Sequence, residues 1–144
     1  MQLGIMPGEP LVWAFSPAYQ VVTIPAGATR ATLRFWWKRS TEESYTYAMS
    51  EPSAALLAGP LTVDTMGYTD DCHEALLLAA DMQTVLSFVS RGLAKDSDWV
   101  LVERDLLPWR GQTVVVYFDA YNHTDLSQRT WMYVDDVSLE VDVP

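Results

Sequence analysis

The sequence has almost no cysteine, few basic residues and no long apolar run. Its 144 residues include one cysteine, Cys72, which excludes an intramolecular disulfide and any zinc site built from several cysteines. The longest apolar candidate, Ala75 to Ala80, falls far short of the roughly 18 residues that a membrane helix needs. No membrane insertion is therefore predicted.

Basic residues are scarce enough to restrict the partners. The chain carries 9 Lys and Arg against 19 Asp and Glu, a net charge of -10 at pH 7. Such a surface repels phosphate, so nucleic acid and anionic membranes are not expected as partners. Calcium, a neutral sugar or a basic protein remains compatible with this charge.

Familiar catalytic motifs are missing as well. The sequence contains no Gly-x-Ser-x-Gly, no His-Glu-x-x-His and no glycine-rich phosphate loop. The two histidines, His73 and His123, stand alone and are expected to be surface or hydrogen-bonded residues. Cys72 is expected to be a small buried hydrophobe. No catalytic residue is predicted on this basis.

What the sequence does contain is β-strand patterning in a composition typical of a folded protein. Hydrophobic residues make up 49% and aromatic residues 12%, against 19% charged residues, which argues against disorder. Between Ala31 and Lys38 the side chains of Leu33, Phe35 and Trp37 alternate with others, which predicts a half-buried strand. Thr113 to Tyr121 alternates in the same way, with Phe118 on its inner face.

Further strands are predicted on both sides of these two. Cys72 to Leu78 and Thr84 to Val89 are typical of a hairpin, although the Ala and Leu content of Glu74 to Met82 also suits a helix. The last predicted strand, Trp131 to Val141, would place Tyr133, Asp135, Val137, Leu139 and Val141 in phase on one face. The remaining predicted strands are Val21 to Ile24 and Trp99 to Arg104.

One long irregular stretch interrupts this pattern between about residues 40 and 71. A stretch of this length is uncommon inside a compact domain and indicates a functional loop or unrecognised strands, Leu61 to Val63 among them. Ser53 to Ala58 suits a short helical turn capped by Ser53. The whole chain, 1–144, is predicted to be one all-β domain, an antiparallel β-sandwich of jelly-roll type with about eight strands.

Four segments in order carry a resemblance to a known group of domains. They are Gln20 to Trp37, Trp99 to Leu106, Gly111 to Phe118, and the Tyr-Val-Asp-Asp-Val-Ser-Leu stretch 133–139. This order resembles bacterial extracellular jelly-roll domains of the galactose-binding-like type, such as the carbohydrate-binding modules of xylanases and glucanases. It is similar, too, to the MAM-like domains of immune-inhibitor-type secreted metallopeptidases. The resemblance also supports strand rather than helix at Cys72 to Leu78.

The resemblance implies a structural calcium ion. In such domains the first Asp of an Asp-Asp-Val pair often helps to bind Ca²⁺, which places Asp135 and Asp136 here as candidate ligands. Calcium takes about six to eight oxygen ligands, so further carboxylates are needed. Glu9, Glu42 and Glu43 are candidates. The alternative is that Asp135 accepts hydrogen bonds from backbone amides or from an arginine.

Outward aromatic side chains indicate a glycan-binding face. Sugar rings stack on flat aromatic faces, with polar side chains at their edges. On the predicted faces Trp36 stands beside Arg34, and Tyr117 and Tyr121 flank Asp119. If the two strands share one sheet, these five residues line one groove. Alternatively, the segment 40–71 covers the rings. Trp13, Trp99 and Trp131 are expected in the core, and Trp109 in a turn packed against the end of the sandwich.

Together these inferences predict a non-catalytic carbohydrate-binding accessory module from a larger secreted or cell-surface protein, whose partner is a polysaccharide or glycan. One alternative is a structural or adhesion spacer that contacts other domains or proteins and binds no sugar. A second is a small β-sandwich glycoside hydrolase using Glu103 or Asp119, which would need two carboxyl groups about 5–10 Å apart in a cleft.

Overall fold

The computed structural model describes residues 1–53, 57, 59–123 and 127–144. This part contains nine strands, one short helix and one turn of 3-10 helix at Leu107–Trp109. The strands and the helix are β1 (Gln2–Gly4), β2 (Pro17–Thr23), β3 (Arg30–Thr41), β4 (Tyr47–Ala48), α1 (Val63–Met66), β5 (Cys72–Ala79), β6 (Val85–Leu93), β7 (Val100–Asp105), β8 (Thr113–Tyr121) and β9 (Thr130–Asp142). No helix among these residues is long and apolar enough to cross a membrane.

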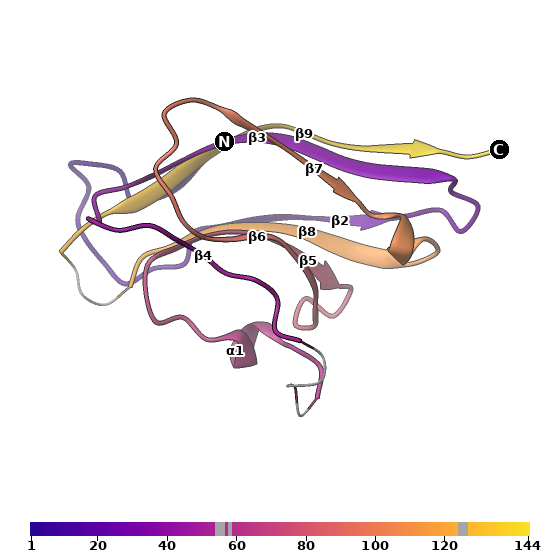
Figure 1. Ribbon diagram of the computed structural model, residues 1–144, viewed down its shortest axis with the longest axis horizontal. Coiled ribbons are helices and arrows are strands. Elements are labelled where there is room, and N and C mark those ends of the chain that lie inside the picture. Colours follow the sequence, from indigo (N-terminus) through magenta and orange to yellow (C-terminus); the bar gives the residue numbers. More distant parts are fainter. Residues whose placement is uncertain (54–56, 58, 124–126) are drawn as a thin grey trace.

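The strands form two antiparallel sheets that face each other (Figure 1). One sheet has the order β1-β9-β3-β7, and the other has the order β2-β8-β5-β6-β4. With the two-residue β4 set aside, the chain alternates between the sheets except at the β5–β6 hairpin, whose strands share one sheet, and this is the topology of a jelly roll. The predicted sandwich is therefore confirmed. The short strands β1 and β4, each at the edge of its sheet, are strands that the sequence did not indicate.

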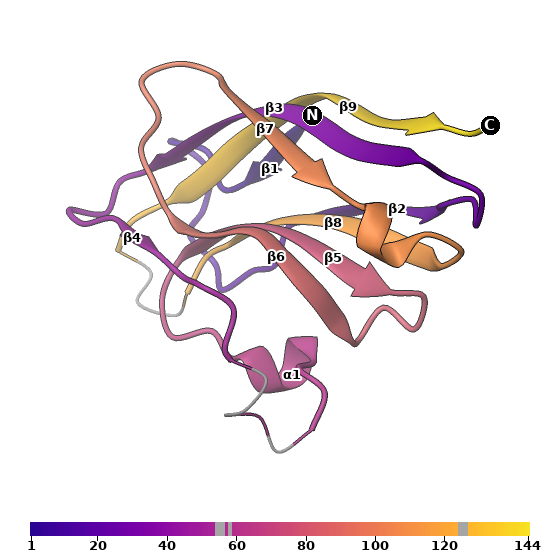
Figure 2. The ribbon, with the colours of Figure 1, turned by 45° about the vertical axis from the view of Figure 1, so that its right-hand side comes forward.

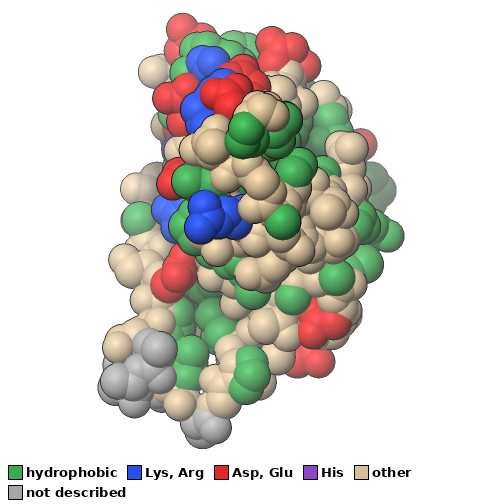
Figure 3. Space-filling view, turned by 90° about the vertical axis from the view of Figure 1, so that its right-hand side faces the viewer, with side chains coloured by type: hydrophobic (Ala, Val, Ile, Leu, Met, Phe, Trp, Pro, Cys, Tyr) green, Lys and Arg blue, Asp and Glu red, His purple; other side chains and the backbone are tan. Residues whose placement is uncertain are grey.

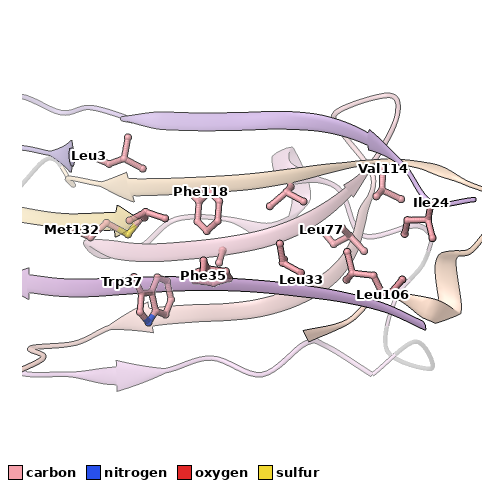
Figure 4. Close-up of a cluster of buried hydrophobic side chains, with 14 of the residues drawn as sticks. Leu3, Ile24, Leu33, Phe35, Trp37, Leu77, Leu106, Val114, Phe118 and Met132 are labelled. Atoms are coloured by element: carbon pink, nitrogen blue, oxygen red, sulfur yellow. The ribbon is translucent and has the colours of Figure 1, made fainter. Parts of the chain in front are cut away.

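The core between the sheets comes from the strands that alternate most regularly. Leu33, Phe35 and Trp37 of β3 are buried, and Phe118 of β8 faces them. The rings of Phe35 and Phe118 meet edge to face, with centroids 4.9 Å apart (Figure 4). Burying such rings stabilises the fold by roughly 2–3 kcal/mol each, so the period-two pattern determines which faces of β3 and β8 meet.

The last strand changes phase part-way along, which corrects the predicted inner face. Met132 and Val134 are buried instead of Tyr133, while Asp135 is exposed. Opposite Arg34–Trp36 of β3, the pairing skips a residue of β9, and Asp136 there has φ +49°. This β-bulge returns Leu139 and Val141 to the core side, where the alternation had placed them.

Residues 59–71, which include α1, cover part of the outer face of the five-stranded sheet (Figure 2). Leu61, Val63 and Met66 pack against a second cluster made by Leu76, Leu78, Phe88 and Val115. Both faces of β5 are therefore buried, which explains why this strand is apolar from Ala75 onward. The expected strand at Leu61–Val63 is a single bridge, Thr62 to Thr84, followed by α1. The helical turn expected at Ser53 to Ala58 lies outside the described residues.

The tryptophans are less buried than expected. Trp13 is 58% exposed and Trp99 is 40% exposed, so their assignment to the core was wrong. Both lie near the ends of the sandwich, outside the alternating part of any strand. Trp131 is half-buried, and Trp109 packs against the core from the 3-10 turn as predicted.

Candidate functional site

The five residues predicted to line one groove lie on two different sheets. Arg34 and Trp36 belong to β3 of the four-stranded sheet, and Tyr117, Asp119 and Tyr121 belong to β8 of the other. In each case the side chains alternate with the core residues, so they point away from the interior on opposite sides of the molecule. A shared groove was therefore wrong, because alternation reveals the face of a strand but not the sheet that contains it.

On the four-stranded sheet, Arg34 is held by acidic neighbours. Its guanidinium lies 2.8 Å from Glu103 and 3.6 Å from Glu140. Acidic and basic side chains gather at the top of the molecule, over this sheet (Figure 3). Trp36 is 39% exposed beside them. Glu103 lies in this sheet and Asp119 in the other, so they do not form the carboxyl pair that a hydrolase needs.

On the five-stranded sheet, two buried carboxyl groups stand side by side. Glu74 of β5 is paired directly with Asp119 of β8, and both residues are fully buried. Glu74 accepts hydrogen bonds from the Tyr68 hydroxyl at 2.6 Å and from Arg91 Nε at 2.7 Å. Burial raises the pKa of Glu74, and Tyr68 and Arg91 oppose that rise by stabilising the carboxylate.

Asp119 lacks such a cation. Its Oδ1 accepts a hydrogen bond from the Ser16 amide at 2.7 Å. Its Oδ2 is buried, and among the described residues no donor lies in hydrogen-bonding geometry to it. Burial and the neighbouring charge of Glu74 raise the pKa of Asp119 to about 7. The Ser16 amide and the Tyr117 hydroxyl lower it only in part.

Four aromatic rings form a cluster next to this polar pair, with the Tyr68 hydroxyl bonded to Glu74. Phe15 lies 5.0 Å from Tyr68 and 4.7 Å from Tyr121, measured between ring centroids. The exposed indole of Trp13 lies 6.0 Å from Phe15, and its Nε1 donates to the Tyr121 hydroxyl at 2.7 Å. Trp13 is thus exposed yet held in one orientation by a hydrogen bond and a ring contact.

A pocket opens beside these rings, between β8, α1 and the β5–β6 turn. Its volume is about 240 Å³, and it is named the Tyr117 pocket here. Aromatic and apolar side chains form its walls, and polar Asp64 and Gln83 stand among them. Asp81 fixes the turn by accepting hydrogen bonds from the amides of Gln83 and Thr84, both at 2.8 Å. The lining residues are Phe15, Val63, Asp64, Tyr68, Leu78, Met82, Gln83 and Tyr117.

A smaller pocket of about 190 Å³ lies on the other side of Tyr68, next to Arg91 and Cys72. Cys72 is buried there, as predicted, and burial raises the pKa of its thiol to about 12. The thiol therefore stays protonated at neutral pH, and a buried, protonated thiol is a poor nucleophile.

The residues predicted to bind calcium are not brought together. Glu9 accepts a hydrogen bond from the Met6 amide, Asp135 accepts one from the Asp136 amide, and Glu42 pairs with Arg129. Within the part of the chain that the structure describes, no three His, Cys, Asp or Glu side chains are grouped as metal ligands. Asp135 thus has a hydrogen bond of the kind named as the alternative, and calcium binding stays a prediction.

His73 has a structural role. His73 is buried, and its Nε2 lies 3.0 Å from the Ser40 carbonyl and 2.9 Å from the Trp131 carbonyl. The Ala94 amide donates to its Nδ1 at 3.3 Å, which places the proton on Nε2. His73 thus joins β5 to β3 and β9 of the opposite sheet and leaves no ring nitrogen for a ligand.

Sequence reasoning missed the main features of this site. Glu74 precedes the apolar run 75–80, and a carboxylate at the start of a strand buried on both faces requires a partner, which is the signal that could have found Arg91. Trp13 and Phe15 precede β2 in a segment without periodicity, so nothing in the sequence placed them over β8.

Comparison with known proteins finds a bacterial metalloprotease precursor, in two strains. The pre-pro-metalloprotease PrtV of Vibrio cholerae serotype O1 is 38% identical over 121 residues, with the same values for strain M66-2 and strain ATCC 39315 / El Tor Inaba N16961. The match covers 84% of this chain but only 11% of the protease precursor. No family model matches the chain, and no solved structure matches it significantly. The chain is thus similar to one segment of a metalloprotease precursor, in agreement with its resemblance to domains of secreted metallopeptidases.

Proposed function

We propose that this chain is a non-catalytic accessory module of a larger extracellular protein, and that it binds carbohydrate in the Tyr117 pocket. The observation that carries the proposal is the pocket itself, in which three aromatic side chains, those of Phe15, Tyr68 and Tyr117, meet polar Asp64 and Gln83. Of the predicted binding residues, Tyr117 lines this pocket, while Asp119 and Tyr121 lie beside and beneath its rings.

The lining suits a sugar. Aromatic faces pack against the C–H groups of a pyranose ring, and a carboxylate or amide at the edge accepts and donates hydrogen bonds to hydroxyls. At about 240 Å³ the pocket is below the size of typical drug-binding sites, which favours one sugar unit or the end of a chain. The net charge of -10 favours a neutral or cationic sugar over an acidic one.

Two observations support an accessory role. The chain is similar to 11% of a protease precursor, which favours a module working beside other domains of a larger, secreted polypeptide. The carboxyl pair that a glycosidase would need, Glu74 and Asp119, is fully buried, and Glu74 is bound to Arg91. A buried, neutralised pair favours a structural role over a hydrolytic one.

Titration with soluble glycans tests the proposal. We expect saturable binding of one or more members of a panel of xylan, glucan and mannan oligosaccharides, followed by intrinsic tryptophan fluorescence and by calorimetry. The variants Gln83→Ala and Phe15→Ala should weaken binding at least about tenfold, the effect of losing about 1.4 kcal/mol.

Trp36→Ala is the matched control, because Trp36 is an exposed aromatic residue on the opposite sheet. It should leave binding unchanged. If Trp36→Ala abolishes binding and the pocket variants do not, the site is wrong. If no neutral or cationic glycan binds at millimolar concentration, carbohydrate binding is wrong and the spacer role takes its place.

A further inference from the structure

The sandwich is open along one side, between β2 of one sheet and β9 of the other. A groove of about 660 Å³ runs there. Residues of β2 and of the part of β9 beyond β1 line it, and core residues Leu33 and Phe118 form its floor. Its remaining lining residues are Met1, Ala18, Tyr19, Gln20, Val22, Thr23, Pro25, Val116, Val137, Ser138, Leu139 and Val141.

One edge of this groove is an incompletely paired strand. β9 spans 13 residues, but β1 pairs only with Trp131–Tyr133, and Met1 exchanges two 2.8 Å hydrogen bonds with Val134. Beyond this point, among the described residues, β9 pairs only with β3. Figure 2 shows β9 running on past β1 toward the C-terminus.

The backbone of this free edge is oriented for pairing. The Asp142 carbonyl accepts a hydrogen bond from the Thr29 amide, so Asp142 faces β3. Because backbone groups alternate along a strand, the amide and carbonyl of Val141 and Leu139 face the open side. Their side chains point into the groove, so a strand added here would gain backbone hydrogen bonds and an apolar surface together.

The charges at this edge limit what kind of strand fits. Asp135, Asp136, Glu140 and Asp142 all lie on the exposed side of β9, and Arg30 pairs with the last two. Lys or Arg at the outward positions of an added strand would meet Asp135 and Asp136, whereas acidic residues would be repelled. Val137, 43% exposed, would be covered by the same strand.

We propose that this groove accepts an extended polypeptide strand, antiparallel to β9 and in line with β1, whose apolar side chains alternate with basic ones. Such β-augmentation uses backbone hydrogen bonds for affinity and alternate side chains for specificity. It would also protect an apolar edge that otherwise favours aggregation. The proposal involves neither the Tyr117 pocket nor sugar binding.

The test is a designed N-terminal extension of the full chain. About seven added residues, at roughly 3.4 Å each, match the unpaired length of β9. The in-register variant has valine at every second added position and lysine at the positions between. The valines are in phase with the inward-facing Leu3 and with Met1 at the end of the groove. The matched control contains the same residues shifted by one position, which directs lysine into the groove.

We expect the in-register extension to raise Tm by about 5 °C or more. It should also slow amide exchange at Leu139 and Val141 at least about tenfold. The shifted control should do neither. Equal Tm and equal exchange in the two variants would overturn the proposal. So would protection of both amides in the unextended chain together with a concentration-dependent dimer, because a second copy would then occupy the edge.

Discussion

Glu74 and Asp119 face each other directly across β5 and β8, but only Glu74 is bound to a cation. Arg91 neutralises Glu74, and the aromatic rings above exclude water from both carboxyls. The negative charge of Glu74 and the loss of hydration therefore both act on Asp119. The result is a carboxyl group that holds its proton up to about pH 7.

This arrangement predicts how Asp119 affects stability. Its pKa rises from 3.8 in the unfolded chain to about 7 in the folded chain, so between these values the folded state holds a proton that the unfolded state has released. Its contribution to stability therefore falls as pH rises from about 4 to about 7 and then becomes constant. Relative to wild type, Asp119→Asn should gain stability over this range, by roughly 3–4 kcal/mol, since each pKa unit corresponds to about 1.4 kcal/mol.

Urea denaturation of both proteins at pH 5 and at pH 8 measures this effect. The difference between wild type and variant is the relevant quantity, because His73 contributes a slope of opposite sign below pH 6.5. A difference that does not change between the two pH values would show that Asp119 is ionised throughout.

Arg91 should be essential because it neutralises a buried charge. Arg91→Leu leaves Glu74 without its cation, and breaking a buried pair in this way costs about 3–5 kcal/mol. The double variant Glu74→Gln/Arg91→Leu removes the charge as well and should recover part of that loss. Chemical denaturation of the three proteins checks this. If the double variant is less stable than Arg91→Leu alone, the unpaired charge is not the cause.

The sequence predicts the sheets well where one residue pattern decides the structure. β3 and β8 each bury one face against the other sheet, so their alternation identifies Phe35 and Phe118 as facing core residues. β9 was predicted less well, because the bulge at Asp136 changes its phase and no local residue pattern reveals a bulge.

The candidate site was less predictable, because it depends on long-range contacts. Tyr117 comes from the most regular strand, but the partners that complete its pocket, Phe15, Asp64 and Gln83, come from three irregular segments. Their positions follow from the way residues 59–71 fold back over β5 and β8. Period-two patterns do not encode such contacts. The sequence therefore predicted an aromatic face, but the prediction that Trp36 belongs to the same face as Tyr117 was wrong.

His73 is predicted to remain neutral in mildly acidic solution. Burial lowers its pKa to about 4, so the folded state is unprotonated at pH values where the unfolded chain binds a proton. Its contribution to stability is complete above about pH 6.5 and is lost as pH falls toward 4. His73→Leu would leave the Ser40 and Trp131 carbonyls without this donor, at a cost of about 1–3 kcal/mol for each buried group.

The ¹⁵N chemical shifts of the imidazole, recorded between pH 7 and pH 5, check the first part of this prediction. They should show a constant Nε2–H tautomer. Protonation of His73 with a midpoint near 6.5 would contradict its buried, doubly bonded position.

Gly4 should be irreplaceable because of a close contact and not because of its backbone angle alone. Gly4 and Gly8 have nearly the same φ, +90° and +93°, so alanine is strained at both, by about 1 kcal/mol. A Cβ at Gly4 would lie 2.3 Å from the Thr130 carbonyl oxygen, whereas nothing lies within 4 Å at Gly8. Gly4→Ala must therefore also displace β1 from β9.

The amide of Val134 reports this displacement, because it donates to the Met1 carbonyl at 2.8 Å. In Gly4→Ala its hydrogen exchange should accelerate at least about tenfold, while Gly8→Ala should lower stability slightly without that local effect. Equal losses in the two variants would mean that backbone strain, and not the approach of the two strands, makes glycine necessary. The same displacement should also weaken the in-register extension, because that strand continues β1.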